Sequence, residues 1–312
     1  MYRVQLGWLA LLRADCCIAA MLIGFSFSPG GLLLPYHLGV LASLDHHGFI
    51  SHTTPLAGSS AGSIAVASHA SGVSPHRALE ASIRVSSHCY NPLFVPAGKL
   101  MGALRHEMNE ILPKDAHHVI NNRQGMTVLA HRELYPTPKS RLVTQFDTRE
   151  CLMDAVCDSS MFPFFTSNKV ARAVRRRNEN HHRLVVDGIF AVSPERLGCP
   201  DFDEVPHDDG VKERYVIRRG KMEVGKKPDR TVMVSCFPTE LLSLSTNNAK
   251  YDVIGSKLDL TNPVGHAAGL VKMACLASNR RELTNLYEEG WKDGEEWARK
   301  EERRNALATL QG

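Results

Sequence analysis

Long uninterrupted apolar runs are missing from this sequence. The stretch VQLGWLALLRADCCIAAMLIGFSF is interrupted by Arg13 and Asp15, and neither half reaches the roughly 18 to 20 residues that a membrane-spanning helix needs. We therefore expect residues 18–27 to form a buried strand. Residues 1–17 are expected to be a separate N-terminal lead-in, either an amphipathic segment or a targeting sequence, and the composition does not distinguish the two.

Cysteine pairs with metal-binding spacing are also missing. The eight cysteines are scattered along the chain, none in a CxxC pair, and most have apolar neighbours. In a long chain this pattern is typical of small buried side chains in a reducing compartment. We expect a cytoplasmic protein that requires neither a metal ion nor a cofactor.

Signatures of nucleic-acid binding are absent as well. The sequence shows no internal repeat, recognition helix, RNP aromatics or zinc-finger spacing, so nucleic acid is not an expected partner. The formal net charge of +4 is modest, and much of the basic excess lies in ARAVRRRNENHHR at 171–183. This segment is interpreted as a solvated loop, or alternatively as a patch that contacts anionic lipid headgroups.

The order of the apolar and amphipathic segments is typical of an α/β fold. With 43% hydrophobic and 22% charged residues among 312, the chain can bury one large core. In the first half, strand-like runs alternate with segments of helical period, which predicts parallel βαβ units. A single domain is expected over 18–312, with a charged, proline-containing insertion at its surface at about 195–230.

The segment Gly58-Ser59-Ser60-Ala61-Gly62 fits the pattern G-x-S-x-G. In this motif a serine lies on a tight turn between a strand and a helix, and its hydroxyl is exposed at the edge of the sheet. Gly58 and Gly62 approach each other so closely that a Cβ would clash. Because TPLAG is predicted to be a buried strand and a helix is expected from about 61 to 69, we predict that Ser60 is a nucleophile.

Histidines are scarce where a Ser-His-Asp triad would need one. Only His207 and His266 follow residue 187, and neither is expected in a loop at a strand end. A carboxylate is then the expected base. Asp187 and Gly188 directly follow the strand-like run LVV, which predicts Asp187 at a strand end, with Gly188 leaving room for the serine turn. An ordinary Asp-Gly turn is the alternative.

A glycine-rich turn, FSPGGLLLPYHLGV, precedes the first expected helix. The backbone N–H groups of Gly30 and Gly31 would lie close to a helix N-terminus, where the helix dipole favours an anion. We predict that they bind the oxyanion of a reaction at Ser60, the alternative being a simple turn.

In this order, the three features resemble the patatin-like phospholipase family. The similarity extends to Tyr36-His37-Leu38-Gly39 after the glycine loop, to CDSSMFPFF at 157–165 and to LYEEGWKDGEEW in the last helix. The first of these is similar to the animal-type branch of the family. The resemblance implies a three-layer α/β/α sandwich with a mostly parallel central sheet.

The resemblance also implies an activity. Ser60 and Asp187 would form a catalytic dyad, and the enzyme would hydrolyse fatty-acyl esters of phospholipids or neutral glycerolipids through an acyl-enzyme intermediate. The implied partner is a lipid at a membrane or lipid-droplet surface. Apolar residues are expected to line a groove for the acyl chain, namely Leu32, Leu33, Leu34, Leu93, Phe94 and the segment MFPFF at 161–165.

The sequence departs from the family pattern near both parts of the expected site. Leu32 to Leu34 stand where a third glycine and an arginine are common, Pro29 lacks a backbone N–H, and the branched Ile189 follows the Asp-Gly pair. These departures favour, as one alternative, a weakly active or inactive lipid-binding or regulatory protein. A second alternative is a triad esterase in which His207 or His266 serves Ser60.

Overall fold

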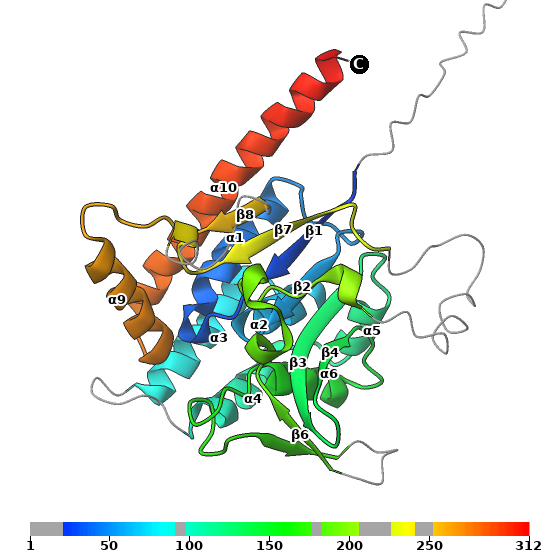
Figure 1. Cartoon of the computed structure of the whole chain (residues 1–312), viewed down its shortest axis with the longest axis vertical. Helices are drawn as coiled ribbons and strands as arrows, with labels where there is room; N and C mark the ends of the chain where they lie inside the picture. The colour runs from blue at the N-terminus through cyan, green and yellow to red at the C-terminus, as the bar shows by residue number, and fades with distance from the viewer. Residues whose placement is uncertain (1–20, 91–97, 176–181, 206–225, 241–251, 312) are drawn as a thin grey trace, which may run out of the picture.

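A computed structural model describes residues 21–90, 98–175, 182–205, 226–240 and 252–311. Within these residues a single eight-stranded sheet forms the centre of the molecule (Figure 1). Its strand order is β5-β6-β3-β2-β1-β7-β8, and β4 pairs with β3. The bounds are β1 Ile23–Phe27, β2 Leu56–Ser59, β3 Thr127–Tyr135, β4 Lys139–Val143, β5 Arg172–Val174, β6 Arg183–Val186, β7 Arg230–Ser235 and β8 Asp252–Gly255.

The middle of the sheet is parallel and one side is antiparallel. The strands β3, β2, β1, β7 and β8 run in the same direction. By contrast, β4 and β6 run antiparallel to β3, and β5 runs antiparallel to β6. The predicted class, α/β with a mostly parallel central sheet, is confirmed.

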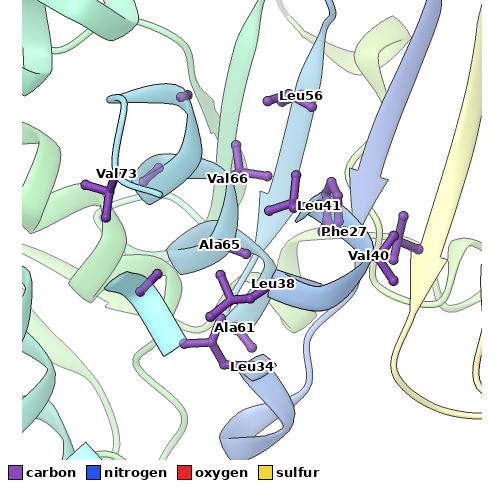
Figure 2. Close-up of a cluster of buried hydrophobic side chains, with 14 of the residues drawn as sticks. Phe27, Leu34, Leu38, Val40, Leu41, Leu56, Ala61, Ala65, Val66 and Val73 are labelled. Atoms are coloured by element: carbon purple, nitrogen blue, oxygen red, sulfur yellow. The ribbon is translucent and has the colours of Figure 1, made fainter. Parts of the chain in front are cut away.

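Helices cover one face of the sheet. Side chains of this face, among them Phe25, Phe27, Leu56 and Leu129, join the main hydrophobic core with residues of the helices; Figure 2 shows part of this cluster. The helices are α1 Leu34–His46, α2 Ala61–Ala70, α3 Pro75–Cys89, α4 Leu100–Ile111, α5 Ala116–Asn121, α6 Arg149–Ser159, α9 Pro263–Cys275 and α10 Arg280–Gln311.

The opposite face, where an α/β/α sandwich would have a second layer of helices, is covered in the described residues by short turns. Ala57 and Val128, which alternate with the residues above, pack against Phe202 and Val205. The turns around them are 3₁₀ helices, η2 Gly188–Ala191, η3 Pro194–Arg196 and η4 Phe202–Glu204. The first part of the predicted 195–230 insertion therefore packs on the sheet, whereas the sequence led us to expect a surface excursion. Residues 206–225, including His207, lie outside the described part of the chain, so the extent of the insertion stays a prediction.

The last helix is fixed to the first by two glycines. A Cβ on Gly39 would lie 2.0 Å from the carbonyl oxygen of Tyr287, and one on Gly290 would lie 2.1 Å from the carbonyl oxygen of Tyr36. In addition, the Tyr36 hydroxyl donates a hydrogen bond of 2.8 Å to Asp293 Oδ2. These contacts explain why glycine stands at both positions, and they place α10 along α1, with the C-terminal end of α10 projecting beyond the body (Figure 1).

The start of α3 has the residue types that favour a helix N-terminus. Pro75 begins α3, and the Ser74 side chain accepts a hydrogen bond from the N–H of Arg77. The first strand starts later than predicted, at Ile23. Residues 1–17, and with them the predicted lead-in, lie outside the described residues. No helix in the described ranges has both the length and the apolar character that a membrane span requires.

The structure describes six of the eight cysteines and part of the basic segment at 171–183. Cys89, Cys157, Cys199 and Cys236 are buried, Cys151 and Cys275 are exposed, and all six are free thiols. In the basic segment, Arg172 forms ion pairs with Asp154 and Asp158, and Arg183 pairs with Glu133. At these two positions the positive charge is therefore balanced within the fold, while residues 176–181 are not described.

Candidate active site

Two strands meet end to end along one edge of β3. Ala130 pairs with Ser59 of β2 and with Leu142 of β4, whereas Arg132 pairs with Ser140 of β4 and with Val186 of β6. A strand has only two edges, so β2 and β6 share the edge that β4 does not occupy. Because β2 is parallel and β6 antiparallel to β3, their carboxyl ends point at each other.

The residues that follow these two ends are Ser60 and Asp187. Their neighbours are in close contact, since a Cβ on Gly188 would lie 2.5 Å from the carbonyl oxygen of Ala130 and 2.6 Å from Cβ of Ser59. Gly188 thus allows the two turns to approach, as its position in the sequence predicted. The direction of β6 was not predicted from the sequence, which indicated only that a strand ends before Asp187.

Ser60 lies on a strained turn between β2 and α2. Its φ of 51° and ψ of −119° place a non-glycine residue at positive φ. A Cβ on Gly58 would lie 2.4 Å from the carbonyl carbon and oxygen of Gly62, and one on Gly62 would lie 2.4 Å from the carbonyl oxygen of Phe27. Both glycines are required by close backbone contacts, which is the geometry expected of a nucleophile elbow.

Ser159, at the end of α6, ties the elbow to the sheet. Its Oγ accepts a hydrogen bond of 2.9 Å from the N–H of Ser60 and donates one of 2.6 Å to the carbonyl oxygen of Ala130. The next residue, Ser160, is also buried, but its hydroxyl has no hydrogen-bond partner among the described protein atoms. The two serines of the CDSSMFPFF segment therefore have different environments, which the sequence alone did not indicate.

Asp187 is only 1% exposed. Its N–H donates to the carbonyl oxygen of Met161, and its Oδ1 accepts a hydrogen bond of 2.9 Å from the N–H of Ile189. Burial raises the pKa of Asp187 to about 7, against the opposing effects of the Ile189 N–H and the Ser60 hydroxyl. A carboxyl group with this pKa is suited to accept and return a proton near neutral pH.

Ser60 lies close to Asp187 but does not form a hydrogen bond with its Oδ2. The Ser60 hydroxyl is close enough to affect the pKa of the carboxyl group, yet Asp187 Oδ2 has no partner with hydrogen-bond geometry among the described atoms. Such loose contacts are common between catalytic groups before substrate binds.

The glycine loop lies beside the elbow at the start of η1 Gly31–Leu33. Gly31 has a φ of 57°, and a Cβ there would lie 2.5 Å from the carbonyl oxygen of Ala274 in α9. A Cβ on Gly30 would lie 2.6 Å from Sγ of Cys236 and 3.6 Å from Cβ of Ala61, the residue after Ser60. Both glycines are thus close to the elbow and have no room for a side chain.

His37, within the Tyr-His-x-Gly segment, contacts the backbone just before this loop. Its Nε2–H donates a hydrogen bond of 2.9 Å to the carbonyl oxygen of Ser28. Burial lowers the pKa of His37 to about 4, so the imidazole is neutral at physiological pH. The sequence placed His37 in a segment that resembles the family, and the structure adds its hydrogen bond to Ser28.

Ser60, Asp187, Gly30 and Gly31 all line one cavity of about 700 Å³. Its walls are mostly apolar, and among the described lining residues there is no lysine, arginine or histidine. Of the residues expected to form an acyl groove, Leu32, Leu34, Phe162 and Phe165 line this cavity, while Leu33 is buried in the main core. Leu93 and Phe94 are not described.

Three further residues singled out in the sequence differ in their position relative to the cavity. His266 is on α9, where its Nδ1 accepts a hydrogen bond from the N–H of Asp259, and it does not line the cavity. Pro29 does line the cavity and packs tightly against Gly198, whose Cβ would lie 2.5 Å from Cδ of Pro29. Ile189 is 40% exposed at the cavity wall, and its N–H, as described above, holds Asp187.

Comparisons with known proteins identify the family of the chain. Residues 25–193, more than half of the chain, match the family model of the patatin-like phospholipases. Patatin-like phospholipase domain-containing protein 4 from Homo sapiens is 28% identical over 156 residues, a match that spans 47% of this chain and 59% of that relative. The crystal structure of VipD from Legionella pneumophila covers 90% of this chain and 67% of its own, at 10% identity and a TM-score of 0.45. On the family match, the chain belongs to the patatin-like phospholipase family.

Proposed function

We propose that this protein hydrolyses fatty-acyl esters of lipids, with Ser60 as the nucleophile and Asp187 as the general base. The observation that carries the proposal is the convergence of β2 and β6 on one edge of β3. This convergence delivers a strained serine and a buried carboxylate to the same apolar cavity. The family membership supports a lipid acyl hydrolase.

In the first half of the reaction, Asp187 accepts the proton of Ser60 as Oγ attacks the ester carbonyl carbon. The negative charge that develops on the carbonyl oxygen is stabilised by backbone N–H groups around Gly30 and Gly31. The tetrahedral intermediate then collapses, the C–O bond to the alcohol breaks, and Asp187 returns the proton to the leaving alcohol. An acyl ester of Ser60 remains.

In the second half, a water molecule takes the place of the alcohol. Asp187 accepts one proton of the water as its oxygen attacks the acyl carbon, and the same N–H groups stabilise the second oxyanion. Collapse of this intermediate breaks the bond to Ser60 Oγ, which regains the proton from Asp187. The product is a free fatty acid.

The cavity favours recognition of the acyl chain over the headgroup. Its described walls are mostly apolar and offer no cationic side chain to a phosphate, so the acyl chain would contribute most of the contacts. We therefore propose activity on both phospholipids and neutral glycerolipids, at a membrane or lipid-droplet surface. Rates should rise with acyl length until the cavity is filled.

The decisive experiment combines a covalent probe with product analysis. A fluorophosphonate should label the wild-type chain and not Ser60→Ala, and Asp187→Asn should label far more slowly. Released fatty acid should be measured on phosphatidylcholine, triacylglycerol and galactolipid. A wild-type chain that neither reacts with the probe nor releases fatty acid from any of them would refute the proposal.

A lipid-binding protein without activity is the second candidate. The observation that favours it is Pro29, which lines the cavity next to the glycine loop and has no N–H to offer an oxyanion. This candidate predicts that the wild-type chain and Ser60→Ala bind lipid equally and that neither reacts with the fluorophosphonate.

A further inference from the structure

Helix α9 forms one wall of the candidate active site. Ala274 and Cys275 line the cavity, and the carbonyl of Ala274 is the group that leaves no room for a side chain on Gly31. Leu270, one turn earlier, is buried in the main core. The inner side of α9 is therefore in direct contact with the loop that we assign to the oxyanion.

The outer side of α9 is apolar and exposed. Val264, Ala267, Ala268 and Val271 recur at helical spacing and, with Cys275, line a shallow groove. We call these five residues the α9 outer face. Val264 is 80% exposed and Val271 56%, and Leu260 in the preceding loop is 81% exposed.

The charges on α9 also distinguish it from an ordinary surface helix. Lys272 borders the α9 outer face, and no aspartate or glutamate occurs in Pro263–Cys275. By contrast, α10 contains many residues of both charge signs. An exposed helix face with several apolar side chains and a cation at its edge is typical of an interfacial helix.

A second group of exposed apolar side chains borders the same cavity. Phe162 and Ile189 line it and are each 40% exposed, and Phe190, 47% exposed, stacks on Phe162 with ring centroids 5.7 Å apart. The cavity is thus bordered by apolar residues from α9 on one hand and from the turns next to Asp187 on the other.

We propose that the α9 outer face docks onto a lipid surface. Cys275 borders both the groove on this face and the cavity, so a lipid lying against α9 has a continuous apolar path to Ser60. The inference rests on the proposed function for the identity of the partner. It adds the surface by which the protein approaches its substrate, with Lys272 placed to meet anionic headgroups.

Vesicle flotation of the full chain tests this inference. Vesicles of phosphatidylcholine with added phosphatidylserine should bind the wild type, and the double variant Val264→Glu/Val271→Glu should bind roughly tenfold more weakly. Lys272→Glu should weaken binding only when phosphatidylserine is present. Leu307→Glu, at a residue of α10 that is 59% exposed, is the matched control and should bind as the wild type does.

Hydrolysis of a water-soluble short-chain ester separates this inference from the proposed function. The double variant should keep the wild-type rate on this ester and lose activity only on vesicles. A wild type that does not hydrolyse the soluble ester would refute the proposed function, whereas the flotation result would still test the docking surface. Equal flotation of the double variant and the wild type would overturn the inference. So would a wild type that does not float, because another segment or a second copy would then cover α9.

Discussion

At the scale of single residues, the raised pKa of Asp187 suits the proposed reaction and lowers the stability of the fold near neutral pH. Burial raises its pKa to about 7 from an ordinary value of 3.8, so the carboxyl group is half ionised near neutral pH. As a general base, Asp187 acts only in its ionised form. We expect kcat/KM on a soluble ester to rise with pH through about 7 and then to level off. A rate that is independent of pH between 5 and 9 would contradict this assignment.

The same pKa makes Asp187 destabilising at high pH. In the unfolded chain the carboxyl ionises near its ordinary pKa, whereas in the fold it stays neutral up to about pH 7. Stability is therefore fully present below about pH 4 and is lost as the pH rises to 7.

Asp187→Asn should remove this loss. We expect the variant to be inactive, yet more stable than the wild type at pH 8 by on the order of a few kcal/mol. The difference should shrink at pH 5, which urea unfolding at the two pH values can measure.

Ser159 and Ser160 offer a matched pair of substitutions. Ser159→Ala leaves the N–H of Ser60 and the carbonyl of Ala130 without their side-chain partner. This should cost about 1–3 kcal/mol of the free energy of unfolding and reduce kcat roughly tenfold. In contrast, the Ser160 hydroxyl has no protein partner, so Ser160→Ala should leave the free energy of unfolding almost unchanged. Equal destabilisation by both variants would show that the bridge through Ser159 is not a positioning contact.

At the scale of elements, the elbow between β2 and α2 has no steric tolerance. A Cβ on Gly62 would lie 2.4 Å from the carbonyl oxygen of Phe27, while a Cβ on Gly102 in α4 meets nothing within 4 Å. Gly62→Ala should therefore abolish folding or fluorophosphonate labelling. Gly102→Ala should stabilise the protein by about 0.5–1 kcal/mol, since alanine favours a helix interior. Thermal unfolding and labelling of the two variants, side by side, check both expectations.

Local elements were readable from the sequence because their signals are local. The G-x-S-x-G turn, the strand before it and the helix after it were predicted because each depends on neighbouring residues. The position of Asp187 after a strand was predicted for the same reason.

The pairing that brings Ser60 and Asp187 together could not be predicted in this way. It depends on β6 lying antiparallel along an edge of β3 beyond the end of β2, a contact between distant segments with no local signature. The hydrogen bonds of His37 and Ser159 were missed because single polar residues do not show their partners in a sequence. The helix α4 and the short strand β8 were not predicted at all.

At the scale of the whole molecule, α10 closes the helical layer against α1. Gly290→Ala would place a Cβ 2.1 Å from the carbonyl oxygen of Tyr36, which forces the two helices apart. We expect a loss of about 2–3 kcal/mol in the free energy of unfolding. By comparison, residues 302–308 are exposed, and removal of the chain after 301 should change stability by only about 0.5 kcal/mol. Urea unfolding that gives similar losses for both would argue against the role of the glycine contact.

The shared edge of β3 also determines which contacts set the spacing within the candidate site. Ser60 and Asp187 follow strands that pair with the same strand, so their separation is set within the sheet and not by α9. The glycine loop is different, because the carbonyl of Ala274 in α9 lies against Gly31. A displacement of α9 would therefore affect the glycine loop first and leave the separation of Ser60 and Asp187 unchanged.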